Sequence, residues 1–237
     1  MMSEYRLPSI DIETVDKDKI YFNPGCALSV HNPGSEHKLL ALLNEYFGEV
    51  KMHNRCCRHT PNLEVDSTII NNCAGCDRRF RSLYEGIQTI SLWEVLASLD
   101  KWPLPKYPGL KVSIQDSCSY RPKPQVHAAV RILLKRMDIE IIEAKAHGTR
   151  SICCGDNFYP TIPIGEVNAF QQSRAAQMPC DDVVVYCISC IKSMAIGGKT
   201  PRHLVDLLLN QNTVVGETDL VLYHDSVQAY IDKSMTF

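Results

Sequence analysis

Cysteine is the residue type whose number and spacing in this chain suit it for chemistry. Of eleven cysteines, ten fall into two groups of five, and each group consists of a single cysteine, an adjacent pair and a C-x-x-C motif. The first group is Cys26, Cys56, Cys57, Cys73 and Cys76, and the second is Cys118, Cys153, Cys154, Cys187 and Cys190. The same order found twice indicates an internal duplication. Cys180 lies outside both groups, and we expect it to be a passive thiol.

Five cysteines in one group are more than a single tetrahedral metal ion requires, because zinc and conventional iron–sulfur clusters take four ligands. Side chains of adjacent residues diverge, so each pair favours a centre with several metal atoms. Gly155 follows the second pair directly and would let the backbone approach inorganic sulfide closely, whereas Arg58 holds this place in the first group. A structural zinc site is the main alternative, because C-x-x-C loops serve zinc equally well.

The elements that must position these cysteines follow from the apolar pattern. Strands are expected over residues 19–22, 49–52 and 67–70, then 110–114, 139–143, 183–186 and, in the tail, 220–223. Helices are expected over residues 35–47, 92–96, 126–137, 167–177 and 203–208. Such alternation predicts an α/β fold with parallel sheets. Every cysteine element follows a strand, so each group should converge where the carboxyl ends of the strands meet.

The pattern also predicts how the chain is divided. We expect a first strand–helix unit over residues 1–100, a proline-rich linker over 101–109, and a second unit with a tail over 110–237. The first half leaves only residues 58–66 between its cysteine pair and the next strand, fewer than the dozen or so of a helical crossover. The connection there should be shortened or antiparallel.

The duplicated arrangement resembles the cysteine-rich CCG family, which includes the CCG-containing subunit of heterodisulfide reductase and the iron–sulfur subunits of lactate-utilisation and glycolate-oxidation systems. The similarity is carried by Asp-Ser-Cys at 116–118, Ile-Cys-Cys-Gly at 152–155, Cys-Ile-Ser-Cys at 187–190 and Asn-Cys-Ala-Gly-Cys at 72–76, and it spans residues 21–209. The resemblance implies that each group of five ligates one non-cubane 4Fe–4S cluster. In the reductase, two such clusters face one another with the substrate disulfide between them.

The resemblance therefore implies an iron–sulfur oxidoreductase that passes electrons to a disulfide or a related small sulfur substrate. One alternative is an electron-transfer subunit in the oxidation of a 2-hydroxy acid such as lactate or glycolate. A third, of a different class, is a zinc-stabilised binding module. No G-x-G-x-x-G or P-loop motif marks a flavin or nucleotide site, so a partner protein must donate or accept the electrons.

Charged residues near the cysteines have two interpretations. Cationic side chains beside the loops could hold an anionic substrate or offset the charge of thiolate-bound clusters, or could simply be solvated. These are Arg55, Arg58, Arg121 and Lys123. Histidines near the pairs could donate protons, although packing roles are the ordinary alternative. These are His53, His59 and His147.

Composition excludes several classes of protein. The chain of 237 residues is 45% hydrophobic and 22% charged with a net charge of −2, which is ordinary for a globular protein and gives no reason to expect nucleic-acid binding. No apolar run is long enough to span a membrane. Residues 1–20 are acidic and lack the apolar core of a signal peptide, so we expect a cytoplasmic protein whose grouped cysteines bind metal.

Overall fold

The structure is a computed structural model that describes residues 15–99 and 102–234. Tertiary contacts divide them into two units: residues 15–99 with 226–234, and residues 102–225. The second unit thus begins within the expected linker, and the end of the tail belongs to the first unit rather than the second. Residues 1–14 of the expected first unit and Lys101 of the expected linker lie outside the described residues.

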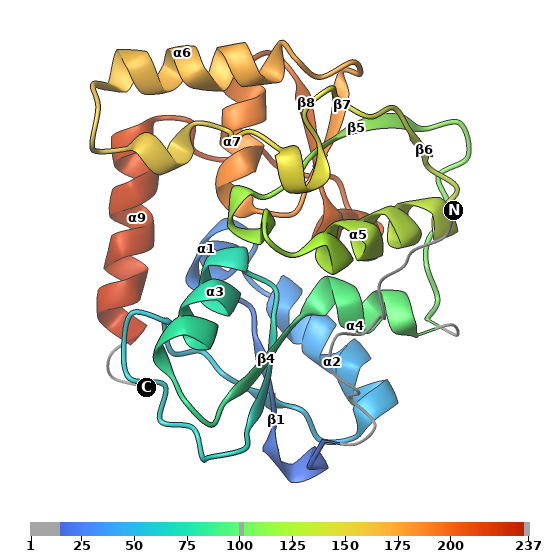
Figure 1. Cartoon of the computed structure of the whole chain (residues 1–237), viewed down its shortest axis with the longest axis vertical. Coiled ribbons are helices and arrows are strands. Elements are labelled where there is room, and N and C mark those ends of the chain that lie inside the picture. The colour runs from blue at the N-terminus through green and yellow to red at the C-terminus, as the bar shows by residue number, and fades with distance from the viewer. Residues whose placement is uncertain (1–14, 100–101, 235–237) are drawn as a thin grey trace. The chain divides into compact units, whose positions relative to one another are not determined.

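The first unit is a parallel four-stranded sheet with the order β2-β1-β3-β4 (Figure 1). Its elements after a short 3-10 helix (η1, Lys17–Lys19) are β1 (Ile20–Asn23), α1 (Cys26–His31), α2 (Ser35–Phe47), β2 (Lys51–Met52), β3 (Thr68–Asn71), α3 (Ala74–Leu83), β4 (Gln88–Ser91) and α4 (Leu92–Ser98). Tyr21 of β1 pairs with Lys51 on one side and with Ile69 on the other. The strand order therefore reverses at β1, which is the place where open parallel sheets bind ligands.

The second unit repeats this topology, with the order β6-β5-β7-β8 and all strands parallel. Its strands and helices are β5 (Lys111–Gln115), η2 (Cys118–Tyr120), α5 (Pro124–Arg136), β6 (Glu140–Ile141), η3 (Gly148–Arg150), η4 (Asp156–Phe158), α6 (Ile164–Ala175), β7 (Asp182–Val185), α7 (Ile188–Ile196), β8 (Thr200–His203) and α8 (Leu204–Leu208). The predicted α/β fold of two repeated strand–helix units is thus confirmed.

The helices form where apolar residues recur every three or four positions. In α2, Leu39, Leu43 and Phe47 are buried, and each such side chain contributes about 1.5–3 kcal/mol. Gly34 and Gly48 flank the helix with positive φ values of 92° and 83°, conformations that favour glycine. In α5 the buried face likewise includes Val126, Val130 and Leu133 among other residues.

The first unit lacks a crossover helix between β2 and β3. Residues 53–67 connect these strands across β1 without a helix, and β3 is nonetheless parallel to β1. Positive φ at Asn62 and Asp66 turns the chain within this loop. Of the two predicted forms, the shortened connection is correct and the antiparallel one is wrong.

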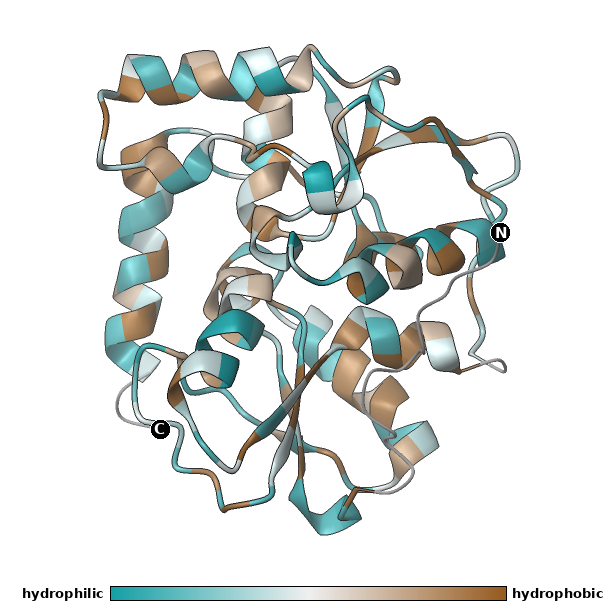
Figure 2. Ribbon diagram, in the orientation of Figure 1, coloured by the Kyte–Doolittle hydropathy of each residue, from teal (hydrophilic) through white to brown (hydrophobic). Residues whose placement is uncertain are grey.

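The expected strand at residues 220–223 is wrong, because these residues begin helix α9 (Leu220–Lys233). The Asp219 carboxylate accepts hydrogen bonds from the backbone N–H groups of Val221 and Leu222, at 2.8 and 3.0 Å, and so caps the helix. Hydrophobic and hydrophilic residues alternate along α9 in Figure 2. Residues 220–225 of the helix are counted with the second unit and residues 226–233 with the first.

The proline-rich segment 102–109 packs on its own unit. The Tyr107 backbone N–H donates to the Met137 carbonyl at 2.8 Å, the Lys106 ammonium donates to the Arg136 carbonyl at 2.8 Å, and Trp102 is 4% exposed. The segment 102–109 is therefore packed against the carboxyl end of α5 and is not an extended linker. Among the described residues, no helix is both long and apolar enough to cross a membrane.

Candidate functional site

The first five cysteines come together at the carboxyl edge of their sheet. Cys26 begins α1 just after β1, the adjacent pair follows β2, and Cys73 caps α3 just after β3. All five line a single cavity of about 490 Å³. Cysteines that span residues 26–76 of the sequence are thus close in space, as the spacing predicts.

The thiols of each unit form one continuous chain of hydrogen-bond contacts. In the first unit the chain runs Cys26–Cys56–Cys57–Cys76–Cys73, and in the second it runs Cys118–Cys153–Cys154–Cys190–Cys187. The order is the same at every step. All of these cysteines are free thiols rather than disulfides, so their sulfurs are available as ligands.

Neighbouring thiols lower the pKa of the first cysteine of each adjacent pair. Hydrogen bonds from Cys26 and Cys57 lower the pKa of the Cys56 thiol, and hydrogen bonds from Cys118 and Cys154 lower the pKa of the Cys153 thiol. Donation to Cys56 raises the pKa of the Cys26 thiol well above its usual value. A metal centre ligated by thiolates would take the place of the protons that these contacts share.

Two glycines allow the cysteine loops to approach closely. A Cβ at Gly25, which has a φ of 80°, would lie 2.6 Å from the Cβ of Cys73. A Cβ at Gly155, which has a φ of 104°, would lie 2.9 Å from the Cγ of Gln171 on α6. Any side chain at either position would displace the loop, so both cysteine groups depend on a glycine beside them.

A buried amide three residues before the first cysteine ties the loops of each unit together. Asn23 donates to Asn71 at 3.0 Å and accepts from the Gly25 backbone at 3.0 Å, which joins the ends of β1 and β3. Gln115, at the matching place, donates to the Ile152 carbonyl at 3.0 Å and accepts from Arg174 at 2.7 Å. The repeat thus includes the buried amide side chains that connect the cysteine loops as well as the cysteines themselves.

Asp116 is the charged residue on which the second group most depends. It is fully buried, and it accepts two hydrogen bonds from Arg131 at 3.0 and 2.9 Å and one from the Tyr186 hydroxyl at 2.8 Å. The Gly148 backbone N–H also donates to it at 2.5 Å, which fastens the segment leading to Cys153. Burial raises the pKa of the Asp116 carboxyl, but hydrogen bonds from His127 and Arg131 outweigh it and hold that pKa well below its usual range.

A second charged cluster lies beside the second cysteine group. The Lys192 ammonium, on α7, pairs with Asp156 and lies 4.0 Å from the centre of the Tyr223 ring. His224 contacts Asp156 at 3.2 Å and stacks on Tyr159 with ring centres 4.5 Å apart. The cation of Lys192 is therefore neutralised within its own unit.

Of the cationic residues predicted from the sequence, only Arg58 is among those that line the cavity of the first unit. Arg55 donates to the Thr60 carbonyl at 3.3 Å and Arg121 donates to the Ser151 carbonyl at 3.0 Å. Both guanidinium groups thus brace their own loops. Lys123 precedes α5 and is partly buried.

The three histidines near the cysteine pairs make structural contacts, as the ordinary interpretation of them expects. His53 is 6% exposed and contacts the Pro61 carbonyl at 3.0 Å, His59 contacts the Ile231 carbonyl at 3.2 Å, and His147 contacts the Ala144 carbonyl at 2.7 Å. His59 also lowers the pKa of the nearby Cys56 thiol, after the larger effects of hydrogen bonds. Cys180 lies at the amino end of β7, away from the edge that carries the second cysteine group.

Sequence reasoning missed Arg78, Arg79 and His224. The two arginines line the first cavity from α3, a helix that the apolar pattern does not reveal. They stand two and three residues after the C-x-x-C motif, and that position is the signal that could have identified them.

The donor atoms of each cysteine group are those that a thiolate-ligated metal centre would use. Within residues 15–99 and 102–234, no group of three or more His, Cys, Asp or Glu side chains is arranged to hold a metal ion. The five sulfurs of each unit instead form a chain in which thiols contact one another. Each chain contains one sulfur more than the four that a zinc ion or a conventional iron–sulfur cluster takes, so the set has donors enough for either.

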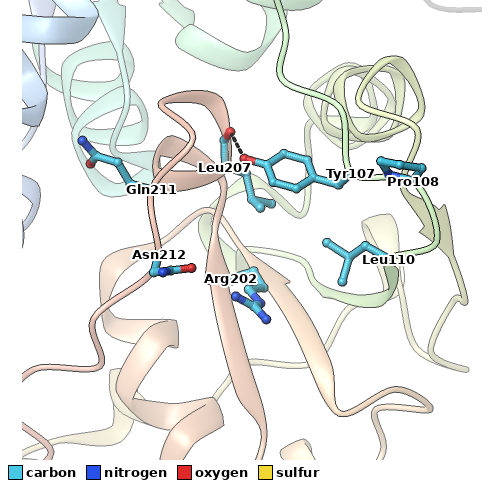
Figure 3. A pocket seen from close by; sticks show the side chains of 7 residues that line it. All are labelled: Tyr107, Pro108, Leu110, Arg202, Leu207, Gln211 and Asn212. Carbon is cyan, nitrogen blue, oxygen red and sulfur yellow. Dashed lines mark hydrogen bonds between the residues drawn. The ribbon is translucent and has the colours of Figure 1, made fainter.

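Another cavity, of about 280 Å³, lies at the opposite edge of the second sheet (Figure 3). Tyr107 and Leu110 precede β5 there, and the Tyr107 hydroxyl donates to the Leu207 carbonyl at 2.7 Å. Arg202 is held by Asp182 at 2.7 Å. This cavity contains no cysteine, and its charged group is already paired, so it does not belong to the cysteine site.

Comparison with known proteins does not assign the chain to a family. No protein-family model matches it, and no curated protein is significantly similar to it.

Proposed function

We propose that each group of five cysteines ligates one 4Fe–4S cluster of non-cubane type, and that the protein is an iron–sulfur oxidoreductase resembling the CCG-containing subunit of heterodisulfide reductase. Its substrate would be a disulfide or a related small sulfur compound. Its electrons would come from a partner protein, because the sequence contains no flavin or nucleotide motif.

The observation that carries the proposal is the identical order of sulfur contacts in the two units. Five thiols meet in the order single, pair, C-x-x-C in both, although the connections between them differ in length and in helix content. The loops that carry the cysteines differ between the two units, yet they bring the sulfurs into the same order of contacts. This indicates that the order of sulfur contacts is itself required for function. Packing alone would not require it, because buried thiols pack well singly.

Reduction of a disulfide takes two electrons and two protons and yields two thiols. A bound iron–sulfur cluster supplies electrons one at a time, so two such centres match the two-electron demand. The chain's own part is to hold the sulfurs and limit access by water. Cys56 and Cys153, whose pKa values are lowered by neighbouring thiols, would be the first to deprotonate for a metal.

The test is the iron and acid-labile sulfide content of anaerobically purified protein. We expect about eight of each per chain, with a brown colour from sulfur-to-iron charge transfer. Cys153→Ser should remove about half of the iron, and Cys180→Ser, the matched control, should remove none. Colourless protein that contains zinc would refute the proposal and favour the zinc-stabilised binding module.

A spectroscopic titration separates reductase from electron-transfer subunit. If disulfides are substrates, adding one to the reduced protein should alter the paramagnetic signal of the clusters. Two thiols should be released for each disulfide consumed. The protein would instead be an electron-transfer subunit if two results came together. Its paramagnetic signal would not change on addition of disulfides or thiols, and the iron-loaded protein would exchange electrons with a partner that oxidises 2-hydroxy acids.

A further inference from the structure

The cavity over the first cysteine group has one wall of sulfur and another of cationic side chains. Its volume of about 490 Å³ is within the range of small-molecule sites, and a cluster on the five sulfurs would fill the sulfur-lined part of it. Arg58 enters it from the loop after the cysteine pair, and Arg78 and Arg79 enter from α3. Leu83, Val227 and Ile231 supply apolar surface. Such a combination suits a ligand with an anionic group, a short apolar body and a sulfur atom.

The three arginines are not neutralised by the protein. Arg79 donates to the Cys57 carbonyl at 2.7 Å and Arg58 donates to the Gln228 side chain at 2.9 Å, both uncharged acceptors. Among the described residues, no carboxylate pairs with any of the three. The nearby Asp77 is buried and already engaged by Arg81 at 2.8 Å and by the Thr89 hydroxyl at 2.7 Å. The guanidinium groups therefore keep their charge and most of their donors for a ligand.

The second unit serves as an internal comparison, because the two units share one topology. Lys192 stands two residues after its C-x-x-C motif, where Arg78 stands in the first unit, but Lys192 is 1% exposed and paired with Asp156. Gly155 replaces Arg58. Arg174, which also lies near the second group, is 1% exposed, and its donors are taken by Gln115, Gln177 and Ala146. The matching positions thus offer no free cation.

We propose that the first cysteine group is the substrate-binding one, and that Arg58, Arg78 and Arg79 bind the carboxylate of a small anionic thiol or disulfide there. The inference rests on the proposed function and narrows it in two ways. It predicts that the substrate carries a negative charge. It also assigns the two cysteine groups different roles, in which the cluster of the first group contacts the substrate's sulfur and the cluster of the second group transfers electrons.

The test compares two thiols of similar length on iron-loaded protein, 3-mercaptopropionate, which carries a negative charge, and 3-mercapto-1-propanol, which carries none. Each is titrated at about 10 mM ionic strength, where exposed charges act over roughly 30 Å. Binding is followed by calorimetry and by the change in the visible spectrum. We expect the carboxylate to bind about tenfold more tightly than the alcohol, as several exposed charge contacts would provide. The preference should shrink in about 1 M salt.

The double variant Arg58→Gln with Arg78→Gln keeps Arg79, and it should show a clearly smaller preference for the carboxylate while retaining its iron. Arg150→Gln removes an exposed cation near the second cysteine pair and should leave the preference unchanged. Equal binding of the two thiols by iron-loaded wild-type protein, or a preference that the double variant leaves undiminished, would overturn this inference alone. Protein without iron would overturn the proposed function instead.

Discussion

Replacing Asp116 by asparagine should destabilise the second unit far more than neutralising the other carboxylate of the same network. Asp116 is fully buried and is surrounded by donors from Arg131, Tyr186 and the Gly148 backbone. Asparagine has nearly the same shape as aspartate. Its NH2 group, however, would replace one carboxylate oxygen, and it could not accept a hydrogen bond from the donors that surround that oxygen. Arg131 would lose half of its compensating charge.

The expected cost is about 3–5 kcal/mol, which is typical when one partner of a buried ion pair is removed. Glu143 provides the matched control, because it also pairs with Arg131, at 2.6 Å, but its side chain is 32% exposed. Water can replace it, so Glu143→Gln should cost only about 0–1 kcal/mol. The predicted difference between the two variants is therefore about 2–5 kcal/mol.

The assay is urea unfolding, followed by the fluorescence of Trp102 in a Trp93→Phe background. Trp93 is buried in the first unit and Trp102 in the second, so the remaining tryptophan reports the second unit. We expect the unfolding midpoint of Asp116→Asn to fall by about 1 M or more, given usual urea dependences. Midpoints that agree within about 0.2 M for the two variants would refute this account of the network.

Three further outcomes follow from the structure. Gly25→Ala should lower the iron content by about half, because its Cβ would lie 2.6 Å from that of Cys73, whereas Gly165→Ala on α6, with open space around it, should not. Gly155→Ala should cost about 1–3 kcal/mol of stability through its positive φ and its contact with Gln171, checked by thermal unfolding against the same control. Chelation of iron should make Cys153, a partly exposed thiol whose pKa its neighbours lower, reactive to iodoacetamide while the reactivity of Cys180 stays constant, as followed by mass spectrometry of peptides.

The convergence of the cysteines could be predicted because two simple signals agree. The repeated spacing identifies which cysteines belong together, and apolar runs such as Val183–Val185 identify the strands that deliver them. Parallel topology then requires the loops to meet at one edge. Nothing beyond the order of residues and the geometry of sheets is needed.

Other elements could not be predicted, because their sequences lack the expected periods. Helix α3 carries several arginines and few apolar residues, whereas α7 is apolar on most faces. Strand β8 contains Pro201, which is tolerated because β8 pairs with β7 on one side only among the described residues. At residues 220–223, four residues are too few to distinguish a helix from a strand.

The common strand order of the two units has an evolutionary consequence. Duplication within one chain gives two copies of the same unit, and each copy then mutates alone. The arginines on α3 and the lysine–aspartate pair beside α7 are what such independent drift and selection would leave behind.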